Sequence, residues 1–338
     1  MNTIRAVLRP LMTELGINPP VSFIIFAISM MVTVYITPKV IKKLCKEHHL
    51  VKDHYKNGEV RIPTGGGIAM IGGILGSMVM TILLFPNVAD LLIFYFIVLS
   101  YGMFGVGDDL LNISQKSKIF LPFFLALPIA LLNSDTSPWL IFGEVELGLG
   151  WNYILAPLYI VVAANLINMH SGFNGLCTGM SSIILWFIAI KAYLVHGVDS
   201  LFYIAPVLGA AVAFWLFDRH PSKIFMGNSG SMILGSAIGG LIVLNNIEVF
   251  GLILLFPHII NFLLYIYWRV FSNTPLQKFG SVRHDNTVEA PNPFTLKWIA
   301  PYYFRLTERQ SVFVMYAVTV IFGIIALLFT WPIKTWFR

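Results

Sequence analysis

Cysteine and charge are both scarce in this sequence. It has only two cysteines, Cys45 and Cys177, with no CxxC pair and no metal-site spacing, so we expect neither a zinc site nor a disulfide framework. Charged residues make up 11% of the chain, whereas an average soluble domain has roughly 25%. No short apolar segment with a cleavage site precedes the first long apolar run, so we also expect no removable signal peptide. This scarcity of charge argues against a water-soluble globular protein.

Long apolar runs are abundant instead. Of the 338 residues 57% are hydrophobic, and the mean hydropathy is +0.79. Runs of about 20 residues match the thickness of a bilayer, which only helices and closed barrels can cross. The sequence predicts an all-α, multi-pass membrane bundle of about ten transmembrane helices in a single domain over 1–338, after an amphipathic or loosely ordered lead-in over 1–18. We place the spans near 20–40, 66–85, 90–107, 119–133, 151–168, 176–195, 201–217, 230–246, 249–271 and 311–332.

The basic residues are unevenly distributed among the loops. Most of the 22 lysines and arginines follow the first, third, seventh and ninth predicted spans, whereas the loops 134–150 and 245–248 have none. The positive-inside rule then places the basic loops in the cytoplasm and both termini outside. The longest loop, about 272–310, is predicted to be a small cytoplasmic subdomain. The net charge of +6 therefore indicates topology and anionic partners, and we expect no nucleic acid.

Two adjacent acids, Asp108 and Asp109, end the third predicted span, and Asn112, Lys116 and Lys118 follow them. Acids at the end of a membrane segment are costly unless they meet water, a cation or a partner. Adjacent acids also repel each other, which a divalent metal or a cationic substrate group relieves. The competing interpretation is a solvated loop in which an aspartate caps a helix.

Two further polar clusters lie in loops that the charge argument places on the same side. Asp53 and Lys56 precede the run Gly65-Gly66-Gly67, whose glycines either expose N–H groups to an anion or allow tight helix packing. Asn165 and Asn168 share a helix face, and Gly172 and Asn174 follow them. Such amides coordinate a hard cation, read a base edge, or form ordinary hydrogen bonds between helices.

The remaining two clusters complete the pattern on that side. Phe225 and Asn228 come just before the eighth span, where free N–H groups suit a phosphate, although an ordinary helix cap explains them equally well. Arg283 and His284 lie in the last basic loop, where Arg283 can clamp a phosphate or simply be solvated. Together the five clusters predict a site for a metal and a polyphosphate. A transporter or flippase of an anionic solute or lipid is the alternative, but it is expected to place polar groups near the bilayer midplane.

These motifs, over roughly 45–310, resemble the polyprenyl-phosphate N-acetylhexosamine-1-phosphate transferase family. The likeness rests on the Asp-Asp pair, the Asn-x-x-Asn-x-x-x-Gly-x-Asn-Gly-Leu run and the Phe-x-Gly run in the family's order. The forms Asn-Met-His-Ser-Gly-Phe-Asn-Gly-Leu and Pro-Ser-Lys-Ile-Phe-Met-Gly look closer to the eukaryotic and archaeal branch. The resemblance implies transfer of N-acetylglucosamine-1-phosphate from a UDP-sugar to dolichyl or another polyprenyl phosphate with release of UMP, the first step of lipid-linked oligosaccharide synthesis for N-glycosylation. It implies a cytoplasmic active site in the cell membrane, or in the endoplasmic reticulum of a eukaryote, and it allows a homodimer.

The resemblance also implies a role for each matching residue. Catalysis falls to Asp108 and Asp109 beside the reacting phosphate and to Lys118 on the pyrophosphate. Asn168 and Asn228 would hold Mg²⁺, or alternatively Mn²⁺. The expected substrate-binding residues are Asn112 near the sugar-phosphate, Gly172, Asn174 and Phe225 around uracil, Arg283 and His284 on phosphate or sugar, and Asp53 and Lys56 in less defined roles.

Asn228 departs from the family pattern, which usually has an aspartate at this position. A neutral amide still binds Mg²⁺ but contributes less charge, so metal affinity is expected to fall. A weakly active or purely binding member of the family is therefore a further alternative. Two routes stay open for the reaction: direct attack of the lipid phosphate on the β-phosphorus, or prior attack by an aspartate to form an acyl-phosphate.

Overall fold

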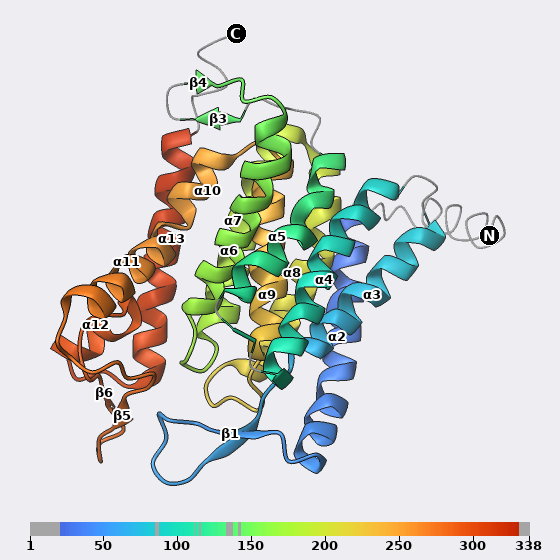
Figure 1. Cartoon of the computed structure of the whole chain (residues 1–338). Coiled ribbons are helices and arrows are strands. Elements are labelled where there is room, and N and C mark those ends of the chain that lie inside the picture. Colours follow the sequence, from blue (N-terminus) through green and yellow to red (C-terminus); the bar gives the residue numbers. More distant parts are fainter. Residues whose placement is uncertain are drawn as a thin grey trace.

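The structure is a computed structural model that describes residues 21–84, 88–111, 113–114, 116–132, 138–140 and 143–330, and these are almost entirely helical (Figure 1). The predicted all-α class is therefore confirmed for this part of the chain. Its α-helices are α2 (Val21–Lys46), α3 (Gly67–Leu84), α4 (Ala89–Leu111), α5 (Ser117–Ala126), α6 (Ala156–Met169), α7 (Leu176–His196), α8 (Leu201–Asp218), α9 (Gly227–Leu244), α10 (Glu248–Leu254), α11 (Phe256–Phe271), α12 (Leu296–Tyr303) and α13 (Glu308–Thr330).

Short elements fill the connections. The 3-10 helices η1 (Leu127–Leu131) and η3 (Val198–Ser200) and the π-helix η2 (Trp151–Leu155) adjoin longer helices. Three antiparallel hairpins pair β1 (Leu50–Lys52) with β2 (Arg61–Pro63), β3 (Trp139–Leu140) with β4 (Gly143–Glu144), and β5 (Ser281–Val282) with β6 (Val288–Glu289).

Seven of the described helices are long and apolar enough to cross a membrane, and there are eight if α10 and α11, which meet at a 59° bend, form one broken span. The two other predicted spans coincide with shorter apolar helices, α3 and α5 with η1. A straight helix needs about 20 residues to cross the hydrocarbon core, so ten full spans stay a prediction. Residues 1–20 and 331–338 lie outside the described part, and the predicted lead-in and the side on which the termini lie also stay predictions.

Helix α9 lies at the centre of the bundle, and 83% of its 18 residues are buried. Helices α4 and α6 pack against it, while α2 packs against α3 and α8, and α13 against α7 and α10. Close approach depends on small residues, because a Cβ on Gly235 would lie 2.5 Å from the Cα of Ala164 in α6. In a membrane the hydrophobic effect does not drive helices together, so they associate through close packing, which small residues at the crossing points allow.

The loops that follow α2, α4, α6, α8 and α11 gather at one end of the bundle, which we call the polar end (Figure 1). Hairpins β1–β2 and β5–β6 and helix α12 lie there, while β3 and β4 lie at the opposite end. The polar end has a hydrophobic core of its own that includes Tyr55, Phe173, Trp298 and Met315. The predicted subdomain 272–310 thus shares its core with the loop after α2 and with α7 and α13. Its separate status stays a prediction.

Candidate active site

Asp108 is held in an ion pair at the end of α4. Its side chain is 1% exposed, its Oδ1 accepts the N–H of Ile113 at 2.9 Å, and its Oδ2 lies 2.7 Å from Nζ of Lys118. A buried carboxylate needs such compensation, because desolvation of an unpaired charge costs several kcal/mol. The predicted neighbours Asp108 and Lys118 are therefore in direct contact. Asn112, predicted beside the sugar-phosphate, lies outside the described residues.

Asp109 points to a different helix. Its Oδ1 accepts the backbone N–H of Asn228 at 2.8 Å, and its Oδ2 accepts that of Ser229 at 3.2 Å. A carboxylate at this position satisfies N–H groups that a helix start leaves unpaired and opposes the positive end of the helix dipole. Helix α9 is thus capped from α4. The prediction that these N–H groups are free for a phosphate is wrong, because Asp109 already occupies them.

Asn168, at the end of α6, reaches the same helix start. Its Oδ1 accepts the hydroxyl of Ser231 at 2.8 Å. Ser231 is one helical turn beyond Asn228 and its hydroxyl also lies 3.1 Å from the carbonyl oxygen of Asn228. A continuous polar path therefore joins Asp109 of α4, Asn228 and Ser231 of α9, and Asn168 of α6. The structure brings together three predicted residues from loops far apart in the sequence.

The glycine run before α3 serves packing. The N–H of Gly66 donates to the carbonyl of Phe225 at 2.9 Å, and that of Gly67 donates to Met226 at 2.8 Å. A Cβ on Gly67 would lie 2.2 Å from the backbone nitrogen of Gly230 in α9. Of the two interpretations left open for this run, the structure supports tight packing, because the N–H groups of Gly66 and Gly67 are already bonded. The contacts fix Phe225, half-buried, beside the start of α3.

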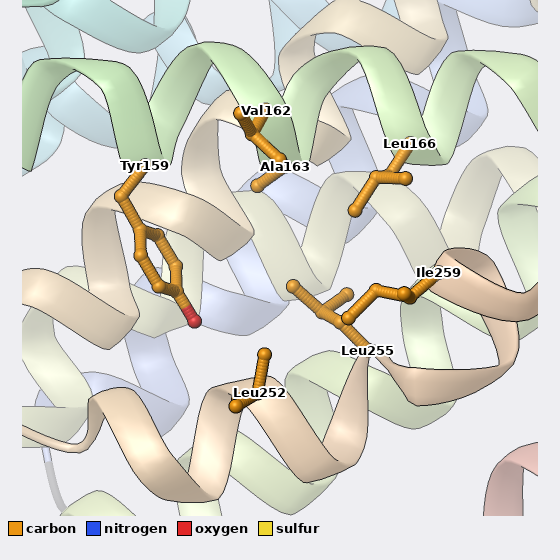
Figure 2. Close-up of a pocket in the computed structure, with 7 residues that line it drawn as sticks. All are labelled: Tyr159, Val162, Ala163, Leu166, Leu252, Leu255 and Ile259. Carbon is orange, nitrogen blue, oxygen red and sulfur yellow. The ribbon is translucent and has the colours of Figure 1, made fainter. Parts of the chain in front are cut away.

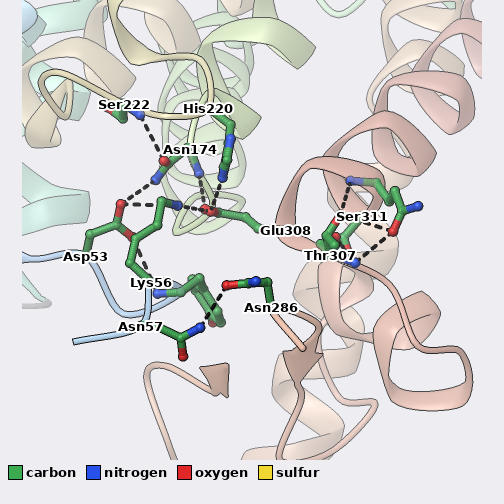
Figure 3. Close-up of polar contacts among 12 residues, drawn as sticks. Asp53, Lys56, Asn57, Asn174, His220, Ser222, Asn286, Thr307, Glu308 and Ser311 are labelled. Atoms are coloured by element: carbon green, nitrogen blue, oxygen red, sulfur yellow. Dashed lines mark hydrogen bonds and ion pairs between the residues drawn. The ribbon is translucent and has the colours of Figure 1, made fainter. Parts of the chain in front are cut away.

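A second polar network surrounds Asn174 (Figure 3). Its Nδ2 donates to Oδ2 of Asp53 at 3.2 Å, its Oδ1 accepts the N–H of Ser222 at 3.0 Å, and its own N–H donates to Oε1 of Glu308 at 2.7 Å. Lys56 pairs with both Asp53, at 3.4 Å, and Glu308. Three loops and the start of α13 are thereby fastened together, which sequence reasoning did not anticipate.

Glu308 is the most consequential residue that sequence reasoning missed. It is 3% exposed, although it stands in the first turn of α13, where an acid is usually a solvated cap. Its carboxylate accepts from Lys56 and Asn174 and lies 3.7 Å from Nε2 of His220. The sequence signal that could have identified Glu308 is its place at the start of a predicted span, on the side of the basic loops. An acid there can pair with a lysine from a neighbouring loop.

Gly172 lies beside a buried lysine. Its φ of +110° is a conformation that favours glycine, and a Cβ there would lie 2.5 Å from Nζ of Lys297. Lys297, in α12, is 8% exposed and donates to the carbonyl of Ser171. Burial, and secondarily Lys278, lowers the pKa of Lys297 to about 8. Nothing in the sequence around Lys297 distinguishes it from a solvated loop lysine.

Arg283 and His284 lie on the β5–β6 hairpin. Nη1 of Arg283 donates to the carbonyl of Val288 at 2.6 Å, so this side chain braces its own hairpin, while His284 is exposed. The hairpin meets the loop after α2 through Nδ2 of Asn57 and Oδ1 of Asn286, 2.8 Å apart. No hydrogen bond or ion pair among the described residues joins Arg283 or His284 to the path from Asp109 to Asn168.

The donor chemistry of the path fits a hard cation. The described residues contain no group of three or more His, Cys, Asp or Glu side chains placed to hold a metal ion. They do offer the carboxylate of Asp109 and the amides of Asn168 and Asn228, and Mg²⁺ prefers oxygen ligands of this kind. Each oxygen of Asp109 accepts one N–H and so retains lone pairs for a further partner.

Comparison with known proteins adds independent evidence. Residues 91–246 match the model of glycosyl transferase family 4. A candidate UDP-N-acetylglucosamine–dolichyl-phosphate N-acetylglucosaminephosphotransferase of Saccharolobus solfataricus is 28% identical over 90% of this chain and 94% of its own length. A protein of the same name from Sulfolobus acidocaldarius is 27% identical over 88% and 93%. The phospho-N-acetylmuramoyl-pentapeptide-transferase of Bacillus subtilis is 28% identical over 59% and 65%. The matched segment runs from α4 to the end of α9 and contains Asp108, Asp109, Asn168 and Asn228. In the part that carries the candidate site, the chain is therefore similar to glycosyl transferase family 4, the polyprenyl-phosphate N-acetylhexosamine-1-phosphate transferases.

Proposed function

We propose that this protein transfers N-acetylglucosamine-1-phosphate from UDP-N-acetylglucosamine to dolichyl or a similar polyprenyl phosphate and releases UMP. The names of the two archaeal relatives support this choice of substrates. The observation that carries the proposal is the convergence of Asp109, Asn228, Ser231 and Asn168 beside the Asp108–Lys118 pair. The reaction would be the first step in assembling a lipid-linked oligosaccharide for N-glycosylation, on the cytoplasmic side.

In the proposed reaction an oxygen of the lipid phosphate bonds to the β-phosphorus of the UDP-sugar, and the bond from that phosphorus to the UMP oxygen breaks. Asp108 accepts the proton of the lipid phosphate, which is easily lost because the second pKa of a phosphate monoester is about 6. Lys118, 2.7 Å from Asp108, would bind the pyrophosphate and reduce repulsion between the two anionic reactants. Prior attack by an aspartate, giving an acyl-phosphate, is the alternative route.

Asn168 and Asn228, with Asp109 between α4 and α9, would hold Mg²⁺ or Mn²⁺. An ion held there would supply positive charge against the phosphate oxygens of the substrates. Asn228 offers a neutral amide, which weakens this attraction relative to a carboxylate. In this arrangement the carboxylate of Asp109 would bind the ion and also fix the start of α9, because it accepts the backbone N–H groups of Asn228 and Ser229.

The UDP-sugar would lie at the polar end. Gly172, Asn174 and Phe225 would contact uracil, with Phe225 stacking on the ring. Arg283 and His284 would reach phosphate or sugar from the hairpin once it closes over the site, and Asn112 would lie near the sugar-phosphate. Asp53 and Lys56 act through Asn174 and Glu308, because these are the groups that they contact.

The prenyl chain needs an apolar path, and a small pocket lies between α6 and the bend of α10 and α11 (Figure 2). It has a volume of about 60 Å³ and is lined by Tyr159, Val162, Ala163, Leu166, Leu252, Leu255 and Ile259. The α6 residues of this set recur at three- and four-residue spacing and so form one stripe of the helix. We infer that part of the prenyl chain lies along this stripe, with its phosphate nearer the polar end.

The decisive experiment scores UMP release by detergent-solubilised protein given UDP-N-acetylglucosamine, dolichyl phosphate and Mg²⁺. Activity that EDTA abolishes and Mg²⁺ restores is expected. In Asp108→Asn, turnover should fall by roughly 10²–10⁴-fold, the usual contribution of a general base, while UDP-N-acetylglucosamine binding measured by calorimetry stays within about twofold.

Two results would contradict the proposal. Unchanged turnover in Asp108→Asn would remove its assigned role. Release of UMP only with UDP-N-acetylmuramoyl-pentapeptide as donor would replace the proposed sugar donor with that one. Nucleotide binding without UMP release from any donor would indicate a binding protein.

A further inference from the structure

A second cavity lies apart from the reaction path, between the end of α8 and the start of α13. Its volume is about 310 Å³, at the lower end of the range for small-molecule sites. It is lined by Asn174, Trp215, Arg219, His220, Arg309, Val312, Phe313 and Tyr316. Both helices are long enough to span a membrane, so their ends at the polar end place this cavity where the hydrocarbon core meets water.

The cavity carries positive charge without an internal counter-charge. Arg219 lies 5.4 Å from the ring of Trp215 and Arg309 lies 5.6 Å from the ring of Phe313, so both guanidinium groups are held over aromatic faces. Neither forms an ion pair with any carboxylate among the described residues, and no lining residue is acidic. Two arginines held in this way favour an anion with several oxygens, such as a phosphate.

His220 does not add to that charge at neutral pH. Burial, followed by the charge of Lys56, lowers the pKa of His220 below its usual 6.5. Its Nε2 lies 3.7 Å from the carboxylate of Glu308, which does not line the cavity (Figure 3). Anion binding in this cavity would therefore depend on Arg219 and Arg309.

The other wall is apolar and continues along the outside of α13. Phe313 is 54% exposed, and Val320 and Ile324, seven and eleven residues later on the same helix stripe, are 37% and 47% exposed. A free phosphate would use the arginines but has no need of this stripe. An occupant with a phosphate at one end and long apolar chains at the other uses both.

We propose that Arg219, Arg309 and the exposed stripe of α13 bind an acidic phospholipid, with the phosphate in the cavity and an acyl chain along the helix. This site is separate from the reaction path, because Asp108, Asp109, Asn168 and Asn228 do not line it. Asn174 lines the cavity and is also a proposed uracil contact, and its side-chain amide is engaged by Asp53 and Ser222. The lipid would thus fasten the α8–α13 junction next to the network that positions Asn174.

The test is native mass spectrometry of the full-length protein in detergent, titrated with dioleoyl-phosphatidylglycerol or dioleoyl-phosphatidylcholine. We expect the wild type to bind the anionic lipid about tenfold more tightly, because phosphatidylglycerol has a net negative charge whereas the choline group of phosphatidylcholine neutralises its phosphate. The variant R219Q/R309Q should lose this preference. The control R269Q/R305Q removes the same charge from the same end of the bundle and should retain it. Ile324→Ala, which shortens the exposed stripe and leaves the aromatic faces under both arginines intact, should weaken binding of both lipids and retain the preference.

Three results would overturn the proposal. R219Q/R309Q keeping the wild-type preference while its melting temperature is unchanged would place the lipid elsewhere. Full displacement of phosphatidylglycerol by millimolar inorganic phosphate would show that the cavity binds the free anion. Displacement by UMP would assign the cavity to the nucleotide. None of these results depends on transferase activity, so they stand apart from the test of the reaction.

Discussion

At the scale of single residues, two neighbouring aspartates have opposite surroundings. Asp108 faces Lys118 and Asp109 faces the start of α9, so the repulsion that their adjacency implies is relieved by different partners. The sequence predicts that both acids need a partner but not which one each would find. Only the turn of α4 decides that, because successive helical residues point about 100° apart.

The residue-scale prediction for the metal concerns Asn228→Asp. A third carboxylate beside Asp109 should lower the melting temperature without Mg²⁺, because like charges repel at short distance. The same change should increase the stabilisation by Mg²⁺ and raise or maintain turnover. Thermal melting over a Mg²⁺ titration measures this, with Asn228→Ala as the uncharged control. An equal Mg²⁺-induced shift in all three proteins would place the ion away from Asn228.

Lys297 should make the free energy of unfolding depend on pH in the alkaline range. Its pKa is about 8 in the folded protein and near 10.5 when exposed, so between these values the unfolded chain binds more protons. Stability should therefore rise as pH increases from 8 to 10.5, by up to about 3 kcal/mol. Lys297→Met should remove this rise, and the exposed control Lys223→Met should keep it. Parallel pH profiles of the melting temperature for Lys297→Met and wild type would contradict the assignment.

At the scale of elements, the approach of α4 to α9 sets the position of both aspartates. A Cβ on Gly105 would lie 2.6 Å from the carbonyl oxygen of Asn228, whereas a Cβ on Gly107 would have Ile113, 4.0 Å away, as its nearest neighbour. The two glycines are two residues apart on one helix, yet only the first lies at the crossing. They therefore provide a matched pair.

Gly105→Ala should destabilise the protein by about 1–3 kcal/mol through overpacking and reduce turnover, because α4 must move away from α9. Gly107→Ala should be neutral or stabilising by up to about 1 kcal/mol, since alanine favours helix. Thermal melting and UMP release measure both effects. Equal effects of the two substitutions would show that the α4–α9 crossing does not control the site.

The helices and the gathering of polar loops could be predicted from sequence, and the direction of several contacts could not. Apolar run length and the asymmetry of Lys and Arg identify the helices and the polar end without any tertiary information. The glycines at Gly66 and Gly67 and the start of α9 look the same in sequence whether they bind an anion or a neighbouring helix. In the structure, the N–H groups at both positions are bonded to a neighbouring segment of the protein. Lys297 and Glu308 escaped notice because burial, which distinguishes them, is set by residues far away along the chain.

At the scale of the whole molecule, the polar end is held together by charges from distant segments. Lys56 forms ion pairs with two buried carboxylates, Asp53 and Glu308. Removing one partner of a buried pair leaves an uncompensated charge, which costs about 3–5 kcal/mol. Lys56→Met should therefore destabilise the protein by this order and increase hydrogen exchange in residues 50–63.

Lys52→Met is the control, because Lys52 pairs with Glu59 on the exposed surface and such pairs contribute little. It should change the melting temperature by no more than a degree or two. Should both lysine variants melt alike, the Lys56 network would not be what fastens this loop to α13.

The contact between Lys56 and Glu308 joins residues 252 positions apart. During synthesis on the ribosome, nearly the whole protein must enter the bilayer before the carboxylate that orders the loop after α2 is made. A nascent chain that has inserted α9 already has both aspartates and both asparagines, yet Asn174 and Lys56 still lack their anchor. The last long helix thus completes the polar network around Asn174, and we expect the loop after α2 to become ordered only once α13 has been made.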